Sequence, residues 1–349
     1  MSLSSVLLVG GAGFLGLHLI QQFHTHCPTT EIHIFDIRPI PNDISAYFTF
    51  DRSRVHFHKG DLTNEDDVRA AIATSRCEVV VHSASPMHGL SQDIYQRVNV
   101  VGTETLLRVA RTMPVRALVY TSSAGVIFNG EDVFNGNELW PYCKVHMDGY
   151  NETKAAAEQA VMRANEPGVL LTVCLRPAGI FGPGDRQLVP GLRAAARMGQ
   201  SKFQLGSNNN LFDWTYAGNV ADAHVLATRR ILDDEHALHL GGETFFITND
   251  EPAYFWTLAR TLWKADGHID KKNIVIHRPV ALVAGYLLKF VSGWLKKEPG
   301  LTPFRVRVVC ATRYHDISKA KELLHYRPAV SLEEGIKHTL DWIYETHKD

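Results

Sequence analysis

The sequence predicts an α/β fold: a Rossmann-like, doubly wound parallel sheet with a smaller C-terminal substrate-binding region. Two observations carry this prediction. A glycine-rich turn follows the first apolar run, residues 6–9, and short apolar runs then alternate with helical patterns up to about residue 180. Such alternation is typical of parallel strands joined by helices that cover both faces of a sheet. The 349 residues, 45% of them hydrophobic, suffice for one large domain or one and a half.

The turn after the first strand has the spacing of a phosphate-binding loop. Glycines stand at Gly10, Gly13 and Gly16, and Gly11 with the last two also fits G-x-G-x-x-G. In such a loop one glycine permits a sharp turn, another lets the backbone approach a pyrophosphate, and the last lets helix and strand pack closely. Strand-to-helix turns use glycine anyway, so the motif alone is weak evidence and depends on its context.

The context is an acid at the end of the next strand. Residues 31–36 form an apolar run that ends in Asp36, about twenty residues past the last glycine. A carboxylate there binds a ribose 2′-hydroxyl and repels a 2′-phosphate, which favours NAD over NADP. Arg38 can soften that preference, and the alternative is that Asp36 merely begins a turn before Pro39. Glycines and acid together predict a dinucleotide site.

The remaining elements of the sheet region follow in order. We expect four further strands and three helices, the strands at 55–59, 78–82, 116–120 and 169–175 and the helices at 63–75, 91–112 and 150–165. Acids in the first turn of the 63–75 helix suit its dipole. Ligands of such a sheet lie at the carboxyl ends of the strands, where the candidate site residues also fall.

A candidate catalytic group combines one helix with one strand end. Tyr150 and Lys154 stand at i and i+4 of the 150–165 helix, about 5–6 Å apart at Cβ. A free phenol has a pKa of about 10, and a neighbouring ammonium stabilises its phenolate. Ser122 or Ser123 at a strand end can hold a substrate oxygen. The alternative is an ordinary pair on a solvated helix, but the glycine loop favours the catalytic interpretation.

Composition excludes several other classes of function. The net charge of −1 gives no basic field for nucleic acid. The five cysteines form no C-x-x-C pair, which argues against zinc and a disulfide framework and suits a reducing compartment. None of the eighteen histidines has a convincing ligand spacing, so we expect no metal. The chain enters a strand almost at once, with no secretory leader before it.

Several longer motifs resemble one known superfamily. The glycine loop, residues 99–103 and 121–124, and the Tyr150/Lys154 pair together resemble the extended short-chain dehydrogenase/reductases. Four further motifs are similar to the 3β-hydroxysteroid dehydrogenase family, namely residues 82–86, 120–128, 175–185 and 213–224. Within that family the likeness is closest to the sterol-4α-carboxylate 3-dehydrogenases (decarboxylating). It spans nearly the whole chain, including residues 331–336.

The resemblance implies a role for each site residue. Ser123, Tyr150 and Lys154 are the implied catalytic residues, with Ser123 as the substrate hydroxyl donor, Tyr150 as the base and Lys154 as its partner. The implied cofactor contacts are Gly10, Gly13, Phe14, Leu15 and Gly16 at the pyrophosphate, Asp36 and Arg38 at the adenosine ribose, Asp61 and Leu62 at the adenine, and Ala84, Ser85, Tyr150, Lys154, Pro177, Ala178 and Ile180 toward the nicotinamide. Asn99 is implied to support the lysine through water, the alternative being that it satisfies its own helix backbone. Gly149 and Asn151 flank Tyr150 where related sequences often carry proline, which affects local rigidity rather than chemistry.

The resemblance also implies an activity. It is the NAD-dependent oxidation of a sterol or terpenoid 3β-hydroxyl to the ketone, with loss of a 4-carboxylate as carbon dioxide where the substrate carries one. One alternative is a 3β-hydroxysteroid dehydrogenase/isomerase-type enzyme of a terpenoid or meroterpenoid pathway. Another is a nucleotide-sugar epimerase or dehydratase, which needs basic groups such as Arg176, Arg186 and Arg193 for a diphosphate. A third is a non-enzymatic NAD(H) sensor, but such proteins typically lose the tyrosine or the lysine, and both are present here.

The C-terminal part raises questions of domain division and of partners. We expect an NAD-binding domain over 1–180 and a substrate-binding region over 181–349, interleaved with the sheet domain. Residues 279–297 are the most apolar segment, but Lys289 and Ser292 interrupt it, so we do not expect a spanning helix. Trp294, Lys296 and Lys297 at its end suit an interfacial helix, and a pocket lid or core helix is the alternative.

Location and oligomeric state follow only from the resemblance. It implies a cytoplasmic-side protein, peripheral on the endoplasmic reticulum membrane, which suits a lipid substrate. It also implies a homodimer formed by the helices at 91–112 and 150–165, whose apolar faces permit a four-helix interface.

Overall fold

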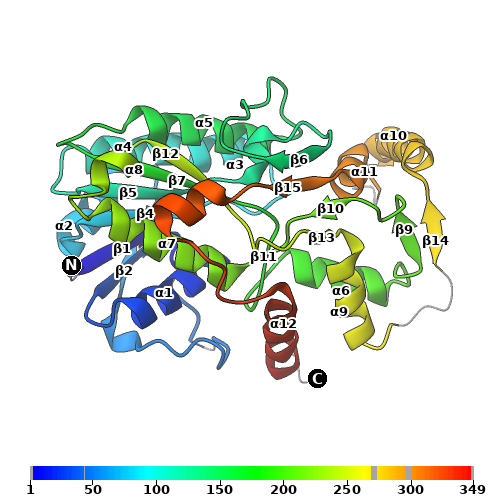
Figure 1. Cartoon of the computed structure of the whole chain (residues 1–349), viewed down its shortest axis with the longest axis horizontal. Coiled ribbons are helices and arrows are strands. Elements are labelled where there is room, and N and C mark those ends of the chain that lie inside the picture. The colour runs from blue at the N-terminus through cyan, green and yellow to red at the C-terminus, as the bar shows by residue number, and fades with distance from the viewer. Residues whose placement is uncertain (1–2, 43, 269–272, 296–300, 347–349) are drawn as a thin grey trace.

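The centre of the protein is a seven-stranded parallel sheet, seen in a computed structural model that describes residues 3–42, 44–268, 273–295 and 301–346. The strand order is β12-β7-β5-β4-β1-β2-β3, as Figure 1 shows. The strands are β1 (Ser5–Val9), β2 (Glu31–Asp36), β3 (Val55–Lys59), β4 (Val79–His82), β5 (Ala117–Thr121), β7 (Leu171–Pro177) and β12 (Glu243–Ile247). This order, with β1 between β4 and β2, confirms the predicted doubly wound fold.

Helices cover both faces of the sheet because its strands are apolar on both sides. Along β1, Val6 and Leu8 belong to one buried cluster and Leu7 and Val9 to another, since successive side chains point to opposite faces. On the Val6 face, α1 (Phe14–His26) packs against α7 (Ala217–Ile231). On the other face lie α2 (Glu65–Ser75), α4 (Thr103–Ala110) and α5 (Gly149–Arg163).

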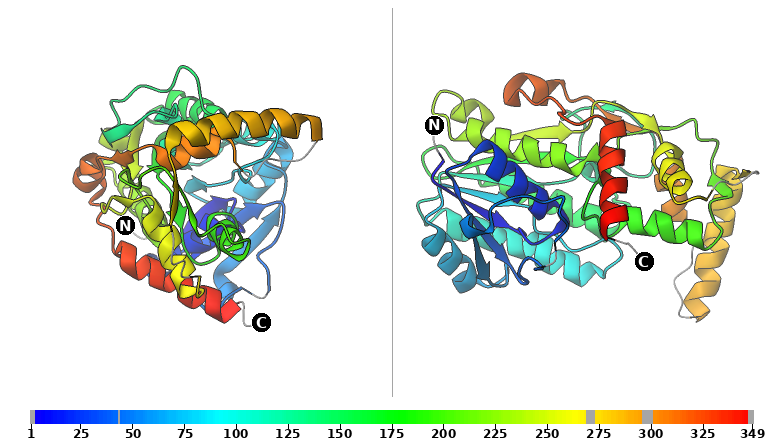
Figure 2. Two further views of the ribbon diagram at one scale, coloured as in Figure 1. Left: turned by 90° about the vertical axis from the view of Figure 1, so that its right-hand side faces the viewer. Right: turned by 90° about the horizontal axis from the view of Figure 1, so that it is seen from below.

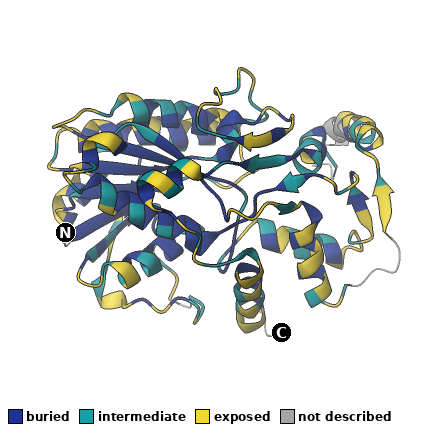
Figure 3. Ribbon diagram, viewed as in Figure 1, coloured by how far each residue is buried: buried dark blue, intermediate teal, exposed yellow. Residues whose placement is uncertain are grey.

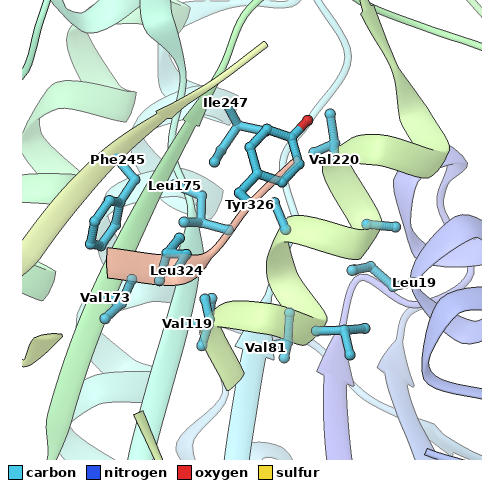
Figure 4. Close-up of a cluster of buried hydrophobic side chains, with 14 of the residues drawn as sticks. Leu19, Val81, Val119, Val173, Leu175, Val220, Phe245, Ile247, Leu324 and Tyr326 are labelled. Atoms are coloured by element: carbon cyan, nitrogen blue, oxygen red, sulfur yellow. The ribbon is translucent and has the colours of Figure 1, made fainter. Parts of the chain in front are cut away.

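The cluster under α1 and α7 draws on distant parts of the chain. Figure 4 shows Leu19 of α1 and Val220 of α7 among the valines at 81, 119 and 173 of three neighbouring strands. Figure 3 shows the central strands of the main sheet as almost completely buried. The strand ends that form the site are therefore held rigidly by the core on both faces.

The helices begin and end close to the predicted positions. Asn64 caps α2 by accepting from the backbone N–H of Asp66, so the helix begins two residues later than expected. Asp148 caps α5 in the same way, through the N–H of Asn151. The expected 91–112 helix is three segments, α3 (Gln92–Tyr95), a π-helical stretch η2 (Gln96–Gly102) and α4. Such π-helical stretches are frequent at functional sites.

A second, four-stranded sheet stands beside the first, in the order β13-β10-β15-β6. It contains β6 (Val133–Gly136), β10 (Leu211–Phe212), β13 (Ala253–Tyr254) and β15 (Arg313–His315). The smaller strands are β8 (Ile180–Phe181), β9 (Phe203–Leu205), β11 (Thr215–Tyr216) and β14 (Ile274–Ile276). The helices of this half are α6 (Leu188–Arg197), α8 (Ala237–Leu240), α9 (Trp256–Ala265), α10 (Arg278–Leu295), α11 (Pro303–Cys310) and α12 (Leu332–Thr346), and short 3₁₀ or π turns are η1 (Arg52–Arg54), η3 (Ala124–Ile127) and η4 (Ala320–Leu324).

Segments cross between the two halves in both directions. Strand β12, late in the chain, pairs with β7 at the edge of the main sheet, and the late helix α7 packs on one face of that sheet. The early strand β6 pairs instead with β15 in the second sheet. We propose the division at residue 180 as a functional one, with the dinucleotide site before it and the substrate site mostly after it.

The α10 helix projects from the end of the molecule that lies away from the N-terminus (Figure 2). Among the described residues, no helix has the length and apolar character that crossing a membrane requires. The side chains of Lys289, Ser292, Trp294, Lys296 and Lys297 lie outside the described part of the structure.

Candidate active site

The candidate residues lie along the carboxyl edge of the main sheet. Gly10 follows β1, Asp36 ends β2, and Ser85 comes shortly after β4. Ser122 and Ser123 continue from β5, and the segment 177–180 follows β7. Because adjacent parallel strands end at the same edge, these groups from distant parts of the chain form one continuous row.

The glycine loop has the close contacts that its spacing predicts. Gly10 has a φ of +84°, and a Cβ there would lie 2.6 Å from the Cα of Ala84, so the loops after β1 and β4 touch. A Cβ at Gly16 would lie 2.4 Å from the carbonyl oxygen of Gly11. Helix α1 begins at Phe14, and no side chain caps it. Its first N–H groups are thus available to an anion, which fits a pyrophosphate.

Asp36 is tied to the glycine loop through its carboxylate. One oxygen accepts a 3.2 Å hydrogen bond from the N–H of Ala12, and the other accepts one of the same length from the N–H of Arg38. The carboxylate therefore begins a turn, as the alternative interpretation held, and also lies beside the glycine loop, while its bond to a ribose stays a prediction. The side chain of Arg38 is exposed, where it can approach a ligand phosphate.

Asp61 and Leu62 follow β3, the first in a network of polar contacts and the second in an apolar contact. The carboxylate of Asp61 accepts from the N–H and hydroxyl of Thr63 and lies 2.7 Å from the guanidinium of Arg97. These hydrogen bonds hold the pKa of Asp61 below its usual value. Leu62 is buried against Gly102 in η2. Asp61 thus presents a fixed negative group at the carboxyl end of β3, and its place beside the adenine stays a prediction.

Lys154 is buried, with 2% of its surface exposed. Its ammonium donates a 2.7 Å hydrogen bond to the carbonyl of Thr121 and a 3.4 Å bond to the hydroxyl of Tyr120. Burial lowers the pKa of Lys154 to about 7, against the opposing effect of Glu158. The cation is therefore anchored at the end of β5, directly before the two serines.

Tyr150 faces the loop after β4. Its phenol lies beside Ser85, and its ring lies 3.9 Å from the ring of His88, centre to centre. Burial, followed by the charge of Asp148, raises the pKa of Tyr150 above its usual value, while Ser85 opposes this. The spacing of Tyr150 and Lys154 predicts a lowered phenol pKa, and this arrangement differs from that expectation because the ammonium bonds to Thr121 instead.

The two serines have different surroundings. The hydroxyl of Ser122 is buried and lacks a hydrogen-bond partner, while its backbone N–H continues the sheet by donating to Leu175. Ser123 is half-buried, and its hydroxyl oxygen accepts a 3.0 Å bond from the N–H of Gly125. That bond leaves the hydroxyl proton of Ser123 free to donate to a substrate oxygen.

Asn99 joins the π-helical stretch to the catalytic helix. Its amide nitrogen donates to the hydroxyl of Thr153 at 3.1 Å, and its amide oxygen accepts from the hydroxyl of Ser85 at 3.0 Å. Neither bond is to its own backbone, which was the alternative. Asn99 thus connects η2 both with Thr153 of α5 and with Ser85, which lies beside the phenol of Tyr150.

A buried ion pair fixes the catalytic helix against the sheet. Arg176 of β7 and Glu158 of α5 lie 2.5 Å apart, with exposed side-chain fractions of 4% and 0%. Tyr142 donates a further 2.6 Å bond to the same carboxylate. Arg176 is therefore not free to bind a substrate phosphate. Arg193 is likewise paired, with Asp266 at 2.7 Å, and only Arg186 of the three arginines considered for a diphosphate is exposed.

His88 also borders the candidate site, although its sequence position did not predict this. Its ring packs at a tilt against that of Tyr150, and its backbone N–H and carbonyl both bond the side-chain amide of Gln187, which lies just before α6. The loop after β4 is thus fastened to the substrate region beside the phenol. The position of His88, three residues after Ser85, was the one feature of the sequence that could have indicated its place near the site. Within the described ranges, no cluster of three or more histidine, cysteine or acidic side chains is arranged to hold a metal ion.

Comparison with known proteins identifies the family. Residues 7–278 match the 3-beta hydroxysteroid dehydrogenase/isomerase family. The chain belongs to that family. Among its relatives is a sterol-4-alpha-carboxylate 3-dehydrogenase (decarboxylating) of Candida albicans, 67% identical over 99% of both chains. A mouse protein of the same description is 38% identical, over 98% of this chain and 91% of its own.

Solved structures resemble this family member in fold. A UDP-glucose 4-epimerase of Thermotoga maritima has a TM-score of 0.72 and 21% identity, over 98% of this chain and 99% of its own. A dTDP-glucose 4,6-dehydratase of Bacillus anthracis, in complex with NAD, has a TM-score of 0.70 and 19% identity, over 99% and 97%. Both carry the same arrangement of parallel sheet and covering helices, so this family member shares their fold.

Proposed function

We propose that this protein oxidises the 3β-hydroxyl of a sterol to the ketone with NAD and releases an adjacent 4-carboxylate as carbon dioxide. As a family member it is an oxidoreductase that acts on a CH–OH group. The observation that carries the proposal is the Tyr150/Lys154 pair on α5, with Lys154 bonded to the end of β5 and Tyr150 packed on the loop after β4, which also touches Gly10. The 67% identity to a relative named for this reaction supports the choice of substrate.

The residues present fit a nicotinamide dinucleotide. The uncapped start of α1 suits its pyrophosphate, and Asp36 suits an adenosine ribose with a free 2′-hydroxyl, so we propose NAD rather than NADP. NAD supplies the hydride acceptor of the reaction. Pro177 ends β7, Ala178 follows it and Ile180 begins β8, and we place the nicotinamide beside these three residues.

The protein's own groups hold and move the alcohol proton. Ser123 donates to the substrate oxygen, and Tyr150 takes the hydroxyl proton as the carbinol hydrogen leaves. The phenol becomes a competent base only when a positive charge stabilises its phenolate, and Lys154 is the cation on its face of α5. After oxidation the new ketone accepts the electron pair of the bond to the carboxylate, and carbon dioxide leaves. The phenol of Tyr150, now protonated, hydrogen-bonds the developing enolate oxygen.

A substrate panel tests this function directly. The purified protein is incubated with NAD and paired 3β-hydroxy sterols or triterpenoids with and without a 4-carboxylate, while NADH formation and carbon dioxide release are followed. We expect NADH with both members of a pair and carbon dioxide from the carboxylated one alone. No NADH with any sterol, together with tight binding of UDP-glucose, would assign the chain to nucleotide-sugar chemistry instead. Ketone products whose ring double bond has migrated would favour the isomerase-type alternative.

We further propose that α10 rests on a lipid surface. Val283, Leu287 and Phe290 are 62%, 62% and 70% exposed, and their spacing places them along one side of the helix. An exposed apolar stripe of this kind inserts into the headgroup region. A peripheral position on the endoplasmic reticulum, facing the cytoplasm, would bring the site to its sterol.

Liposome flotation tests the lipid contact. We expect the protein to float with vesicles and the double variant Leu287→Asp/Leu288→Asp to stay in solution with unchanged thermal unfolding. Leu238→Asp, at another strongly exposed leucine, is the matched control and should float normally. Unmodified protein that stays in solution would end this proposal.

We also propose a homodimer through the α3–η2–α4 and α5 face. Ile94 and Val101, 41% and 44% exposed, are apolar groups on that side. Light scattering should give the mass of two chains, and Val101→Glu should give one. A monomer in the unmodified protein would contradict it.

A further inference from the structure

Arg313 of β15 is a shielded cation without an acidic partner. Its guanidinium is sandwiched between two aromatic rings, with its central carbon 4.2 Å from the ring centre of Phe128 and 4.6 Å from that of Phe212. One terminal nitrogen donates a 3.3 Å bond to the carbonyl of Val308. The Nε–H is buried and has no hydrogen-bond partner, and Arg313 forms no ion pair with any residue that the structure describes.

The nearest acid is already engaged elsewhere. Asp213 accepts a 2.8 Å bond from the backbone N–H of His315 and a 3.0 Å bond from its ring. Burial lowers the pKa of Arg313 to about 9, although the charge of Asp213 opposes this. A buried charge without a counter-ion costs several kcal/mol, and aromatic faces return only part of that cost. A ligand that brings an anion to this position would remove the cost.

The two rings connect Arg313 to the candidate active site. Phe128 ends the 3₁₀ turn that Ser123 begins. The ring of Phe212 lies so close to Gly179 that a Cβ there would come within 2.5 Å of it, and Gly179 follows Ala178. Backbone hydrogen bonds connect the same two regions. The carbonyl of Arg313 accepts from the N–H of Asp213, and the N–H of Thr215 donates to the carbonyl of Gly179.

We propose that Arg313 binds the carboxylate of the substrate and selects 4-carboxy sterols over those without that group. The inference rests on the proposed function, because only there does the substrate carry the anion. A guanidinium matches a carboxylate in shape and charge, and flanking rings that exclude water strengthen the pair. In a 4-carboxy sterol the carboxylate and the 3-hydroxyl are attached to adjacent ring carbons. If Ser123 holds the hydroxyl, the partner of the carboxylate must come from the wall of the site next to the 3₁₀ turn that Ser123 begins. Phe128 places Arg313 there.

Trp214 gives the same wall a second unused donor. Its indole N–H is buried without a partner, and its ring packs 4.4 Å from that of Phe212. The wall thus carries two buried donors that no acceptor of the described chain satisfies. Buried donors are normally paired, and a ligand anion at this position could accept from both of these.

The test compares two substrates across three variants. Arg313→Gln removes the charge, Arg313→Lys keeps it without the planar fork, and Arg327→Gln is the matched control at an exposed arginine. Each protein is assayed with NAD and a pair of 3β-hydroxy sterols that differ only in the 4-carboxylate. For Arg313→Gln we expect the KM of the carboxylated sterol to rise about 10- to 100-fold. The kcat/KM of the other sterol should stay within about two-fold. Arg313→Lys should fall between, and Arg327→Gln should match the unmodified protein.

Other outcomes would overturn the assignment. Equal losses with both sterols would make Arg313 structural, and an unchanged KM for the carboxylated sterol would show that another group binds it. A loss of NAD affinity in Arg313→Gln would assign the anion to the cofactor. If Arg313→Gln fails to fold, the KM split of Arg313→Lys decides in the same way. If the unmodified protein oxidises neither sterol, the proposed function itself fails and takes this inference with it.

Discussion

The ammonium of Lys154 donates a 2.7 Å hydrogen bond to the carbonyl of Thr121, at the end of the strand that leads into the two serines. The catalytic helix and the serine turn are therefore joined by a buried cation and not by apolar contact alone. Tyr150, one helical turn earlier, lies beside Ser85 on the loop after β4. One helix thus contacts both loops between which we propose that the nicotinamide binds.

Replacing Lys154 by Met should separate two functions of this cation. Without the ammonium, nothing on this face of α5 stabilises the phenolate, so kcat should fall at least about 100-fold. NAD affinity should fall as well, because we expect Lys154 also to bind the nicotinamide ribose. Removing a costly buried charge should leave the thermal unfolding midpoint unchanged or raised. Activity assays, NAD titration and calorimetry measure the three, and a strong fall in the midpoint would instead make Lys154 a structural residue.

The two serines should differ in their importance for turnover. Ser123→Ala removes the free hydroxyl donor and should lower kcat about 100-fold with little effect on NAD binding. Ser122→Ala removes a buried hydroxyl that has no partner, so activity and stability should change little. Steady-state kinetics of both variants decide between them. The opposite ranking would move the substrate contact from Ser123 to Ser122.

The buried pair of Arg176 and Glu158 should support both fold and site. Glu158→Gln leaves the guanidinium without its counter-charge and should lower the free energy of unfolding by about 3–5 kcal/mol. The matched control is Glu166→Gln in the more exposed pair with Arg111, which should cost less than about 1 kcal/mol. Urea unfolding measures both. Equal, small losses would contradict the role assigned to the buried pair.

Buried histidines should make the protein sensitive to acid. Burial lowers the pKa of His82 to about 3 and that of His224 to about 4, from 6.5. Between pH 6.5 and these lowered pKa values, the unfolded chain binds protons that the folded chain does not. The free energy of unfolding therefore falls as the pH drops below 6.5. Each histidine contributes about 1.4 kcal/mol per pH unit in that window.

Urea unfolding at a series of pH values measures this dependence. His224→Gln should flatten the slope between pH 6.5 and about 4, because one titrating group is removed. A slope that the variant does not change would mean that His224 is protonated in the fold as easily as in the unfolded chain.

Much of the fold could be predicted from the sequence because its determinants are local. The continuous apolar runs at 79–82 and 117–121 become central strands, and the glycines at 10 and 16 meet backbone so closely that no other residue fits. The division of the 91–112 helix by a π-helical stretch could not be predicted from periodicity, because the seven residues of that stretch are too few to show a period different from that of an α-helix.

The candidate site could be predicted in its membership but not in its contacts. The i, i+4 spacing places Tyr150 and Lys154 on one face, yet it does not determine the direction of either long side chain. The ammonium turns to Thr121 because a carbonyl at the end of β5 lies within reach in the interior. His88 and Arg313 were missed for the same reason, since their neighbours come from parts of the chain far away in sequence.

The most direct test of the central claim is the turnover of Tyr150→Phe with NAD and a 4-carboxylated 3β-hydroxy sterol. The variant keeps the ring that packs on His88 and loses only the phenolic oxygen. The account predicts that NADH formation falls at least about 1,000-fold while the Kd for NAD stays within a few-fold. Turnover close to that of the unmodified protein would show that another group removes the alcohol proton.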